Sequence, residues 1–316
     1  SLALQWLPVP GTHIVSASYA GDTNYAPSQS NNVTITVGKA ATSTVVTASP
    51  APAIVNPGTT VSFTIQVSTP VLPATGVLMP TGTVVLTSSA NPAVQIQSVT
   101  IDANGTATLT YTPTVSGSEI LSFTYSGDSN YNGSFTTNTV IAPALTLNTI
   151  NPNPVRRGDS INFSATVSPF GNSSEQPSDI VLNFFQGSTL KLSVPVSRAS
   201  GATGNYSLAS VVGPSGIDLA TGTYSVIANY AQGSGAYPSM ASNVGTLTVG
   251  LASSSTALTI APAQTILLGQ QLDLTATVTG TAGLPFATSL VTIFDGATNL
   301  TPAGLTINGA SPVSQV

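Results

Sequence analysis

The fifteen residues from Gly11 to Tyr25, GTHIVSASYAGDTNY, decide how this chain is organised, because the stretch occurs more than once. It returns as GSEILSFTYSGDSNY at residues 117–131, and a less regular third copy, GTYSVIANYAQG, occupies residues 222–233. One tyrosine holds the same place in each copy, at spacings of 106 and 105 residues: Tyr19, Tyr125 and Tyr230. A fixed period of this length indicates an array of similar structural units.

Each copy predicts a β-hairpin. Within residues 121–125 the apolar side chains Leu, Phe and Tyr alternate with Ser and Thr, and the other copies follow the same pattern. Alternation at period two indicates a strand that is buried on one side. The Gly-Asp pair then favours a turn, because Gly accepts positive φ and Asp bonds to its own backbone. A second apolar stretch follows the turn, at residues 33–37 in the first copy, and completes a hairpin that closes each unit.

The residues that define this motif are predicted to be structural: Tyr19, Gly21, Asp22, Tyr25, Tyr125, Gly127, Asp128, Tyr131 and Tyr230. The two motif aspartates also suggest calcium ligands. However, a calcium site needs about six to eight oxygens, usually with several carboxylates, and each turn offers one Asp beside Asn. Turn formation is therefore the favoured interpretation, and no metal is expected.

The composition is typical of an all-β protein with many turns. Of the 316 residues, 41% are hydrophobic and only 5% are charged, about a fifth of the usual share. The 28 Gly and 23 Pro residues interrupt stretches rich in Thr and Val, and no long apolar helical pattern is present. Ten acidic residues against five basic ones argue against nucleic acid or an anionic membrane as a partner. No apolar run reaches the roughly 20 residues of a membrane span.

The repeat divides the chain into four parts. Residues 1–40 hold the closing hairpin of a unit, 41–143 and 144–250 are predicted to be complete domains, and 251–316 begin a further domain that stops before its hairpin. One hairpin with a short lead-in buries too little surface to be stable alone. The absence of cysteine means that stability depends on the apolar cores rather than on disulfides.

The two incomplete parts are predicted to complement each other. If a second copy followed Val316, its Tyr19 would come 105 residues after Tyr230, which is the repeat period itself. We therefore expect copies to be joined head-to-tail, either by peptide bonds in a longer chain or by strand donation between subunits. A segment cut at a convenient place is the alternative.

The motif resembles the bacterial immunoglobulin-like (Big) repeat domains of large surface and secreted proteins. The residues that carry the resemblance are the two Tyr-x-Gly-Asp-x-Asn-Tyr segments, 19–25 and 125–131, together with VTIFDG at 291–296. The resemblance implies seven-stranded Greek-key β-sandwiches in series, an extracellular or cell-surface location, and a stalk, adhesin or fibre role. It implies no catalytic residue and no cofactor.

Catalysis is not expected from the residues either. His13 is the only histidine, so neither a histidine metal cluster nor a Ser-His-Asp set is available in one chain. Its counterparts in the other copies are Glu119 and Tyr224, which suggests a position with a loose requirement. The acids are scattered through turns, so paired carboxylates for glycoside hydrolysis are not predicted.

Four aromatic residues suggest a strip for sugar stacking or self-association: Trp6, Tyr25, Tyr131 and Tyr237. Packing of the tyrosines against the end of a sandwich is the favoured interpretation. Trp6 is the only tryptophan, and it is retained as a candidate for self-association.

These observations predict an extracellular structural protein that forms a stalk or filament and whose main partner is another copy of itself. Thr/Ser-rich outer faces also suit contact with polysaccharide or a cell surface, so an adhesin or carbohydrate-binding array is the first alternative. An accessory region of a secreted hydrolase is the second.

Overall fold

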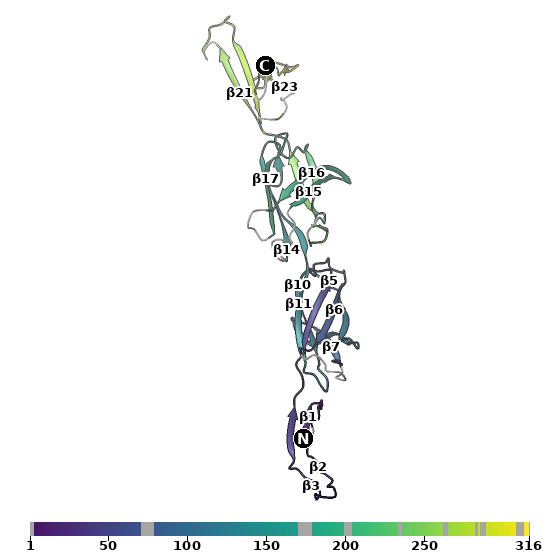
Figure 1. Cartoon of the computed structure of the whole chain (residues 1–316). Coiled ribbons are helices and arrows are strands. Elements are labelled where there is room, and N and C mark those ends of the chain that lie inside the picture. Colours follow the sequence, from purple (N-terminus) through teal and green to yellow (C-terminus); the bar gives the residue numbers. More distant parts are fainter. Residues whose placement is uncertain are drawn as a thin grey trace. The chain divides into compact units, whose positions relative to one another are not determined.

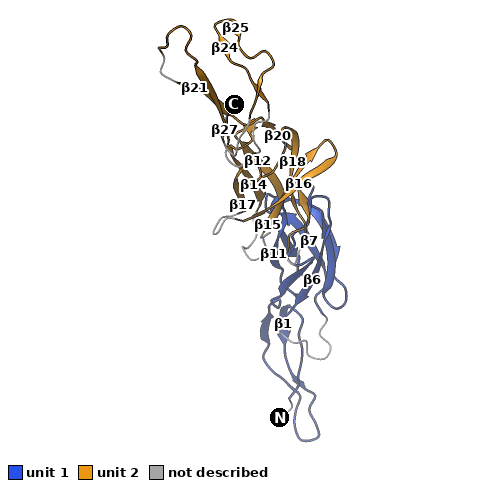
Figure 2. Ribbon diagram, turned by 90° about the horizontal axis from the view of Figure 1, so that it is seen from above, with its two compact units in different colours: residues 1–143 blue, residues 144–316 orange. Residues whose placement is uncertain are grey.

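Alternating apolar and polar residues form β-strands throughout the described part of the chain. The computed structural model describes residues 3–70, 79–169, 179–198, 204–232, 236–261, 265–281, 284, 289–307 and 313–315. It contains two compact units, residues 1–143 and 144–316 (Figure 2). The all-β prediction is confirmed, and the four-part division of the sequence stays a prediction.

The first hairpin consists of β1 (Gly11–Val15) and β4 (Val33–Val37), which pair antiparallel from Gly11 opposite Val37 (Figure 1). A second short pair, β2 (Ser18–Tyr19) and β3 (Ser28–Gln29), extends it. The prediction of one continuous half-buried strand is wrong here. The strand is interrupted after Val15, and its side chains are exposed because no described strand outside the hairpin pairs with β1 or β4.

Between residues 41 and 143, the part of the chain that the structure describes forms a sandwich of seven strands, as the resemblance implied. One sheet has the order β5-β6-β9 and the other β11-β10-β7-β8. The strands are β5 (Ser43–Ser49), β6 (Val61–Ser68), β7 (Thr83–Ser88), β8 (Asn91–Thr100), β9 (Thr106–Tyr111), β10 (Gly117–Tyr125) and β11 (Ser134–Ala142).

The core of this sandwich comes from the inward faces of both sheets. Alternate residues of β6, from Val61 to Val67, are fully buried against Leu121, Phe123 and Tyr125 of β10. The rings of Phe63 and Phe123 lie 5.0 Å apart between their centroids. A turn at Asn104-Gly105 precedes β9, and Gly105 has a φ of 76°.

Residues 144–250 form a second sandwich on the same plan. One sheet is β12-β14-β17, and the other is β13-β20-β18-β15-β16, with β19 beside β18. The strands are β12 (Ala144–Asn151), β13 (Val155–Arg156), β14 (Ser160–Ser168), β15 (Asp179–Gln186), β16 (Thr189–Ser197), β17 (Asn205–Val211), β18 (Gly222–Tyr230), β19 (Met240–Ala241) and β20 (Gly245–Gly250). Gly233, at the altered motif of the third copy, lies outside the described residues.

In both sandwiches the strand segment near the start pairs in parallel with the last strand. Ile54 forms a parallel bridge with Ile141 of β11, and β13 pairs in parallel with β20. Two strands that run in the same direction place the beginning of the domain at one end and its exit at the other. Each sandwich therefore receives the chain at one end and releases it at the opposite end.

The described residues after 250 form the beginning of a further sandwich. β21 (Ser254–Ala261), β22 (Asp273–Gly280) and β27 (Val313–Gln315) make one sheet. The VTIFDG segment at residues 291–296 contributes to two short strands, β23 (Leu290–Val291) and β24 (Phe294–Asp295). They pair with β26 (Leu305–Thr306) and β25 (Thr298–Asn299) respectively. Ala276, Val278 and Ile293 are already buried, and they mark the inner side of this sandwich.

Candidate functional site

The Tyr-x-Gly-Asp turn is the best-defined polar feature of the chain, and its second copy shows how it is built. The Asp128 carboxylate accepts hydrogen bonds from the backbone amides of Asn130 and Tyr131, at 2.7 and 2.8 Å. Its other oxygen accepts from the amide and the hydroxyl of Thr81, both at 2.8 Å. The carboxylate therefore folds its own turn and also holds the segment that leads into β7.

Glycine is required at the neighbouring position. Gly127 has a φ of 75°, a backbone conformation that residues with a Cβ rarely adopt. A Cβ there would lie 2.8 Å from the amide of Gly133 and 2.8 Å from the carbonyl of Tyr131. Gly21 has the same conformation in the first copy. The Gly-Asp pair is thus set by backbone geometry as well as by hydrogen bonding.

Tyr125 joins the same contact from the interior of the sandwich. Its hydroxyl donates to the Thr81 carbonyl. Burial, followed by the nearby Asp128 and Tyr131, raises the pKa of Tyr125 to about 12. Partial burial also raises the pKa of the Asp128 carboxyl, but hydrogen bonds from Thr81, Asn130 and Tyr131 outweigh it, so that pKa lies below its ordinary value. The turn is therefore most stable with a neutral tyrosine and an ionised aspartate.

The linker that precedes the sandwich is fixed to this turn. Ala40 forms a parallel bridge with Tyr131, donating to the Asn130 carbonyl at 2.9 Å and accepting from the Asn132 amide at 2.8 Å. The Lys39 ammonium donates to the Asp128 carbonyl. The sequence analysis did not predict this contact. The turn of one unit thus binds the chain that arrives from the unit before it.

The first copy of the turn has the same internal bonds but a different outer partner. The Asp22 carboxylate accepts from the amides of Asn24 and Tyr25 at 2.7 and 2.9 Å, as its counterpart does. Its second oxygen accepts the Tyr19 hydroxyl at 2.6 Å. That hydroxyl, followed by the two amides, lowers the pKa of the Asp22 carboxyl, and the same bond raises the pKa of Tyr19. Residues 20–27 line an open surface cavity of about 470 Å³ beside this turn.

The four aromatic candidates separate by their surroundings. Tyr131 and Tyr237 are buried, and the Tyr237 hydroxyl donates to the Pro169 carbonyl at 3.3 Å. Tyr25 and Trp6 are exposed. Trp6 packs edge-on against His13, with 5.0 Å between the ring centroids. Self-association through Trp6 stays a prediction. The remaining motif tyrosine, Tyr230, is buried at the end of β18.

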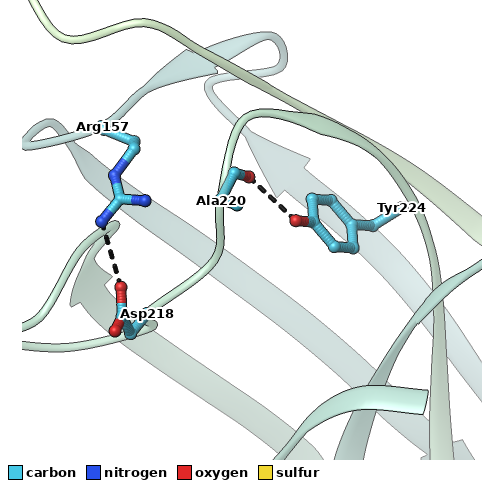
Figure 3. A network of polar contacts seen from close by, with 4 residues as sticks. All are labelled: Arg157, Asp218, Ala220 and Tyr224. Carbon is cyan, nitrogen blue, oxygen red and sulfur yellow. Dashed lines mark hydrogen bonds and ion pairs between the residues drawn. The ribbon is translucent and has the colours of Figure 1, made fainter. Parts of the chain in front are cut away.

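The position held by His13, Glu119 and Tyr224 has a polar role in each copy. The His13 Nε2–H donates to the Val9 carbonyl at 2.7 Å, four residues back along the chain. The Tyr224 hydroxyl likewise donates to the Ala220 carbonyl at 2.9 Å, also four residues back (Figure 3). Both side chains thus form a hydrogen bond with the loop that leads into the hairpin. In the second copy Glu119 accepts the Tyr111 hydroxyl instead. Burial, followed by this contact with Glu119, raises the pKa of Tyr111 to about 12.

Figure 3 also shows the ion pair near this loop, between the Arg157 guanidinium and the Asp218 carboxylate at 3.1 Å. Asp218 is largely exposed, and an ion pair at such a surface contributes at most about 1 kcal/mol.

Within the described ranges, no three His, Cys, Asp or Glu side chains come together as metal ligands. Nor do those ranges contain a helix long and apolar enough to cross a membrane. In this structure the motif aspartates bind backbone amides and the hydroxyls of Thr81 and Tyr19.

Comparison with known proteins identifies part of the chain. Residues 46–142 match the family model of the bacterial Ig-like domain (group 3). No curated protein matches the sequence.

Several solved structures are similar at low identity. A fragment of the titin I-band is 11% identical, covering 83% of this chain and 83% of that one, with a TM-score of 0.36. A tetra-tandem repeat from the extending region of a large adhesion protein is 21% identical, covering 98% of this chain and 73% of that one, with a TM-score of 0.32. Salmonella alpha-2-macroglobulin is 10% identical over 79% of this chain, with a TM-score of 0.34. The chain spans 19% of the length of that protein.

Proposed function

We propose that this chain, in which residues 46–142 form a bacterial Ig-like domain of group 3, is a structural stalk or filament segment at the cell surface or outside the cell. The match of residues 46–142 to the bacterial Ig-like family supports the location outside the cell. The role is mechanical, and it requires no catalytic residue.

The observation that carries the proposal is the parallel pairing of the strands at the start and end of each sandwich. Force applied along the chain pulls β13 and β20 in opposite directions along their length. The bridge between Ile54 and Ile141 is loaded in the same way. Hydrogen bonds loaded in this direction must break together rather than one after another. Such a domain resists extension more strongly than one whose ends lie side by side.

Side-chain bonds strengthen this pairing in the second sandwich. Asn153, in the loop between β12 and β13, donates through its amide nitrogen to the Thr246 carbonyl. Its amide oxygen accepts from the Thr248 backbone at 2.9 Å. One exposed side chain thus joins the first part of the domain to its last strand.

The linker contacts support the same role in the first sandwich. Ala40 is paired with the turn at Tyr131, and Thr42 donates to the Asn132 carbonyl at 2.8 Å. Backbone hydrogen bonds therefore begin immediately after the linker. Little unpaired chain can extend before the folded domain itself carries the load.

Single-molecule force spectroscopy of the chain, held at both ends, tests this proposal. We expect two separate unfolding events, each lengthening the chain by about 3.3–3.6 Å per residue released. Asn153→Ala should lower the force of one event and leave the other unchanged.

Asn183→Ala is the matched control, because Asn183 accepts the Ser193 hydroxyl at 2.7 Å between β15 and β16, away from the loaded pair. Each variant loses cross-strand bonds worth about 0.5–1.5 kcal/mol apiece at equilibrium. If both variants lowered the unfolding force equally, or neither did, the mechanical interpretation would be wrong.

A further inference from the structure

Two Asn-Gly pairs in the first sandwich share the same local chemistry but have different surroundings. Asn104-Gly105 precedes β9, and Asn132-Gly133 precedes β11. The third Asn-Gly pair of the sequence, at residues 308–309, lies outside the described residues. An asparagine followed by glycine is open to reaction with its own backbone, because glycine has no side chain that could shield the amide nitrogen. The structure separates the two pairs by whether that nitrogen is free to react.

The reaction in question replaces the asparagine amide by a carboxylic acid. The amide nitrogen of the following glycine loses its proton to water and attacks the asparagine Cγ, and the bond from Cγ to Nδ2 breaks. Nδ2 takes up a proton and leaves as ammonia, so a cyclic succinimide remains. Water then adds to either ring carbonyl and opens the ring, which gives aspartate or isoaspartate. The net change is the uptake of water and the release of ammonia, with no oxidant or reductant.

The Asn104-Gly105 pair is protected by its surroundings. The Gly105 amide donates to the Asp102 carbonyl at 2.9 Å, and this bond keeps the amide proton in place. Gly105 is buried, and a Cβ there would lie 2.4 Å from the Val67 carbonyl oxygen. A ring closed on this nitrogen therefore has little room, and water has little access to open it.

The Asn132-Gly133 pair is exposed, and its reacting nitrogen is free. The Gly133 amide makes no hydrogen bond to another described residue. The Asn132 carbonyl accepts the Thr42 hydroxyl at 2.8 Å, and a donor on this oxygen stabilises the charge that forms when the peptide nitrogen loses its proton. The Asn104 carbonyl accepts the Gln66 amide at 2.9 Å in a similar way. The two pairs therefore differ mainly in the burial of the glycine and in the N–H group that must react.

We propose that Asn132-Gly133 is a site of spontaneous deamidation, and that the reaction weakens the contact between the linker and the turn. The Asn132 amide donates to the Ala40 carbonyl at 2.8 Å, and its Nδ2 donates to the Lys39 carbonyl at 3.2 Å. Aspartate at this position places a carboxylate oxygen against the Lys39 carbonyl, where the amide donor had been. Isoaspartate also routes the chain through Cβ, which lengthens the backbone just after the paired segment. The proposal concerns covalent chemistry within the first sandwich and does not depend on the stalk function.

Site-resolved deamidation of the full-length chain tests this proposal. The chain is incubated at mildly alkaline pH, folded or unfolded in urea, and the peptides that contain residues 104 and 132 are followed by mass spectrometry. In the folded chain, we expect acid to form at residue 132 about three to ten times faster than at residue 104, because one protecting hydrogen bond must break at the slower site. In urea the two rates should converge. Equal rates in the folded chain, or faster conversion at residue 104, would overturn the proposal.

Hydrogen exchange on the peptide that covers residues 39–42 tests the effect on the linker. Asn132→Asp carries one product of the reaction, and exchange there should be about two to ten times faster than in the natural chain, as expected for the loss of one hydrogen bond. The aged natural chain should change in the same direction, and Asn132→Gln should prevent the change on ageing. Asn104→Asp is the matched control and should leave this peptide unchanged. Unchanged exchange in both Asn132→Asp and the aged chain, or an equal increase in Asn104→Asp, would contradict the proposed weakening of the contact.

Discussion

The first and second copies of the motif have nearly the same sequence but very different surroundings. Both form an antiparallel hairpin, and both close the Gly-Asp turn with a carboxylate that accepts two amides. Only the second copy has another strand beside it, since β10 pairs with β7 as well as with β11. The comparison teaches that local sequence is sufficient for the hairpin and its turn. Burial of the apolar face depends on a neighbouring sheet that the motif does not itself contain.

The largest difference between the copies should come from truncating the same apolar position. Leu121→Ala removes a fully buried side chain from the core, and we expect a loss of about 2–5 kcal/mol in the free energy of unfolding. Val15→Ala, measured at a concentration where the chain is monomeric, should change stability by about 0.5 kcal/mol or less. Hydrogen exchange followed by mass spectrometry, read on peptides from residues 41–143 and 11–37, separates the two effects. Similar losses at both positions would contradict the comparison.

A smaller difference is expected at the motif aspartates. Asp128→Ala removes an acceptor of bonds from Thr81, Asn130 and Tyr131, and should cost the first sandwich about 1–3 kcal/mol. Asp22→Ala should loosen only its own turn. The measurement is urea unfolding with exchange detected on the same peptides. An Asp128 variant as stable as the natural chain would show that the turn does not hold Thr81 in place.

Removing the two motif tyrosine hydroxyls should change stability by amounts that differ less than those of the aspartate variants. Tyr125→Phe deletes the bond to the Thr81 carbonyl inside the sandwich, with an expected cost of about 0.5–1.5 kcal/mol. Tyr19→Phe deletes an exposed bond to Asp22 and should have almost no effect on monomer stability. Thermal unfolding of the two variants beside the natural chain gives the comparison. A larger loss of thermal stability in Tyr19→Phe than in Tyr125→Phe would contradict this prediction.

The last expected effects come from pH. The pKa of Tyr125 is raised from 10.0 to about 12, so folding favours the neutral phenol. Its contribution to stability is fully present below pH 10 and is lost as the pH rises towards 12. The lowered pKa of Asp128 has the opposite sense, because its contribution is present above the ordinary value of 3.8 and is lost as the pH falls through the lower folded value.

Tyrosinate absorbance and unfolding followed across both pH ranges would measure these contributions. Tyr125→Phe and Asp128→Asn serve as the respective controls, since each should flatten one limb of the profile. An unchanged alkaline limb in Tyr125→Phe would assign that limb to other tyrosines, such as Tyr111 and Tyr206, whose pKa values are also raised to about 12.

Much of the fold could be predicted from the sequence, because alternation at period two is a local signal. It predicted β10, and the strand over residues 33–37 that closes the first hairpin, within a few residues. It failed where a strand is interrupted, after Val15, because alternation continues through a break in pairing. Alternation also cannot report whether a facing sheet is present, so it does not predict how far the first hairpin is buried.

The polar contacts were less predictable, for a different reason. The bond from Lys39 to the Asp128 carbonyl joins residues 89 positions apart, and no local pattern encodes such a contact. The position of His13, Glu119 and Tyr224 was interpreted as having a loose requirement because the three side chains are chemically unlike. Two of them nevertheless make the same bond to a carbonyl four residues back. His13 and Tyr224 share the ability to donate a hydrogen bond, which is not apparent from residue identity alone.

The parallel pairing of the strands at the start and end of each sandwich also bears on how such a protein could change in length during evolution. A domain that receives the chain at one end and releases it at the other can be duplicated in frame, since the new copy needs no rearranged connection. Unequal recombination between repeats of about 105 residues would then add or remove whole domains. Selection could adjust reach in domain-sized steps, with each core left intact.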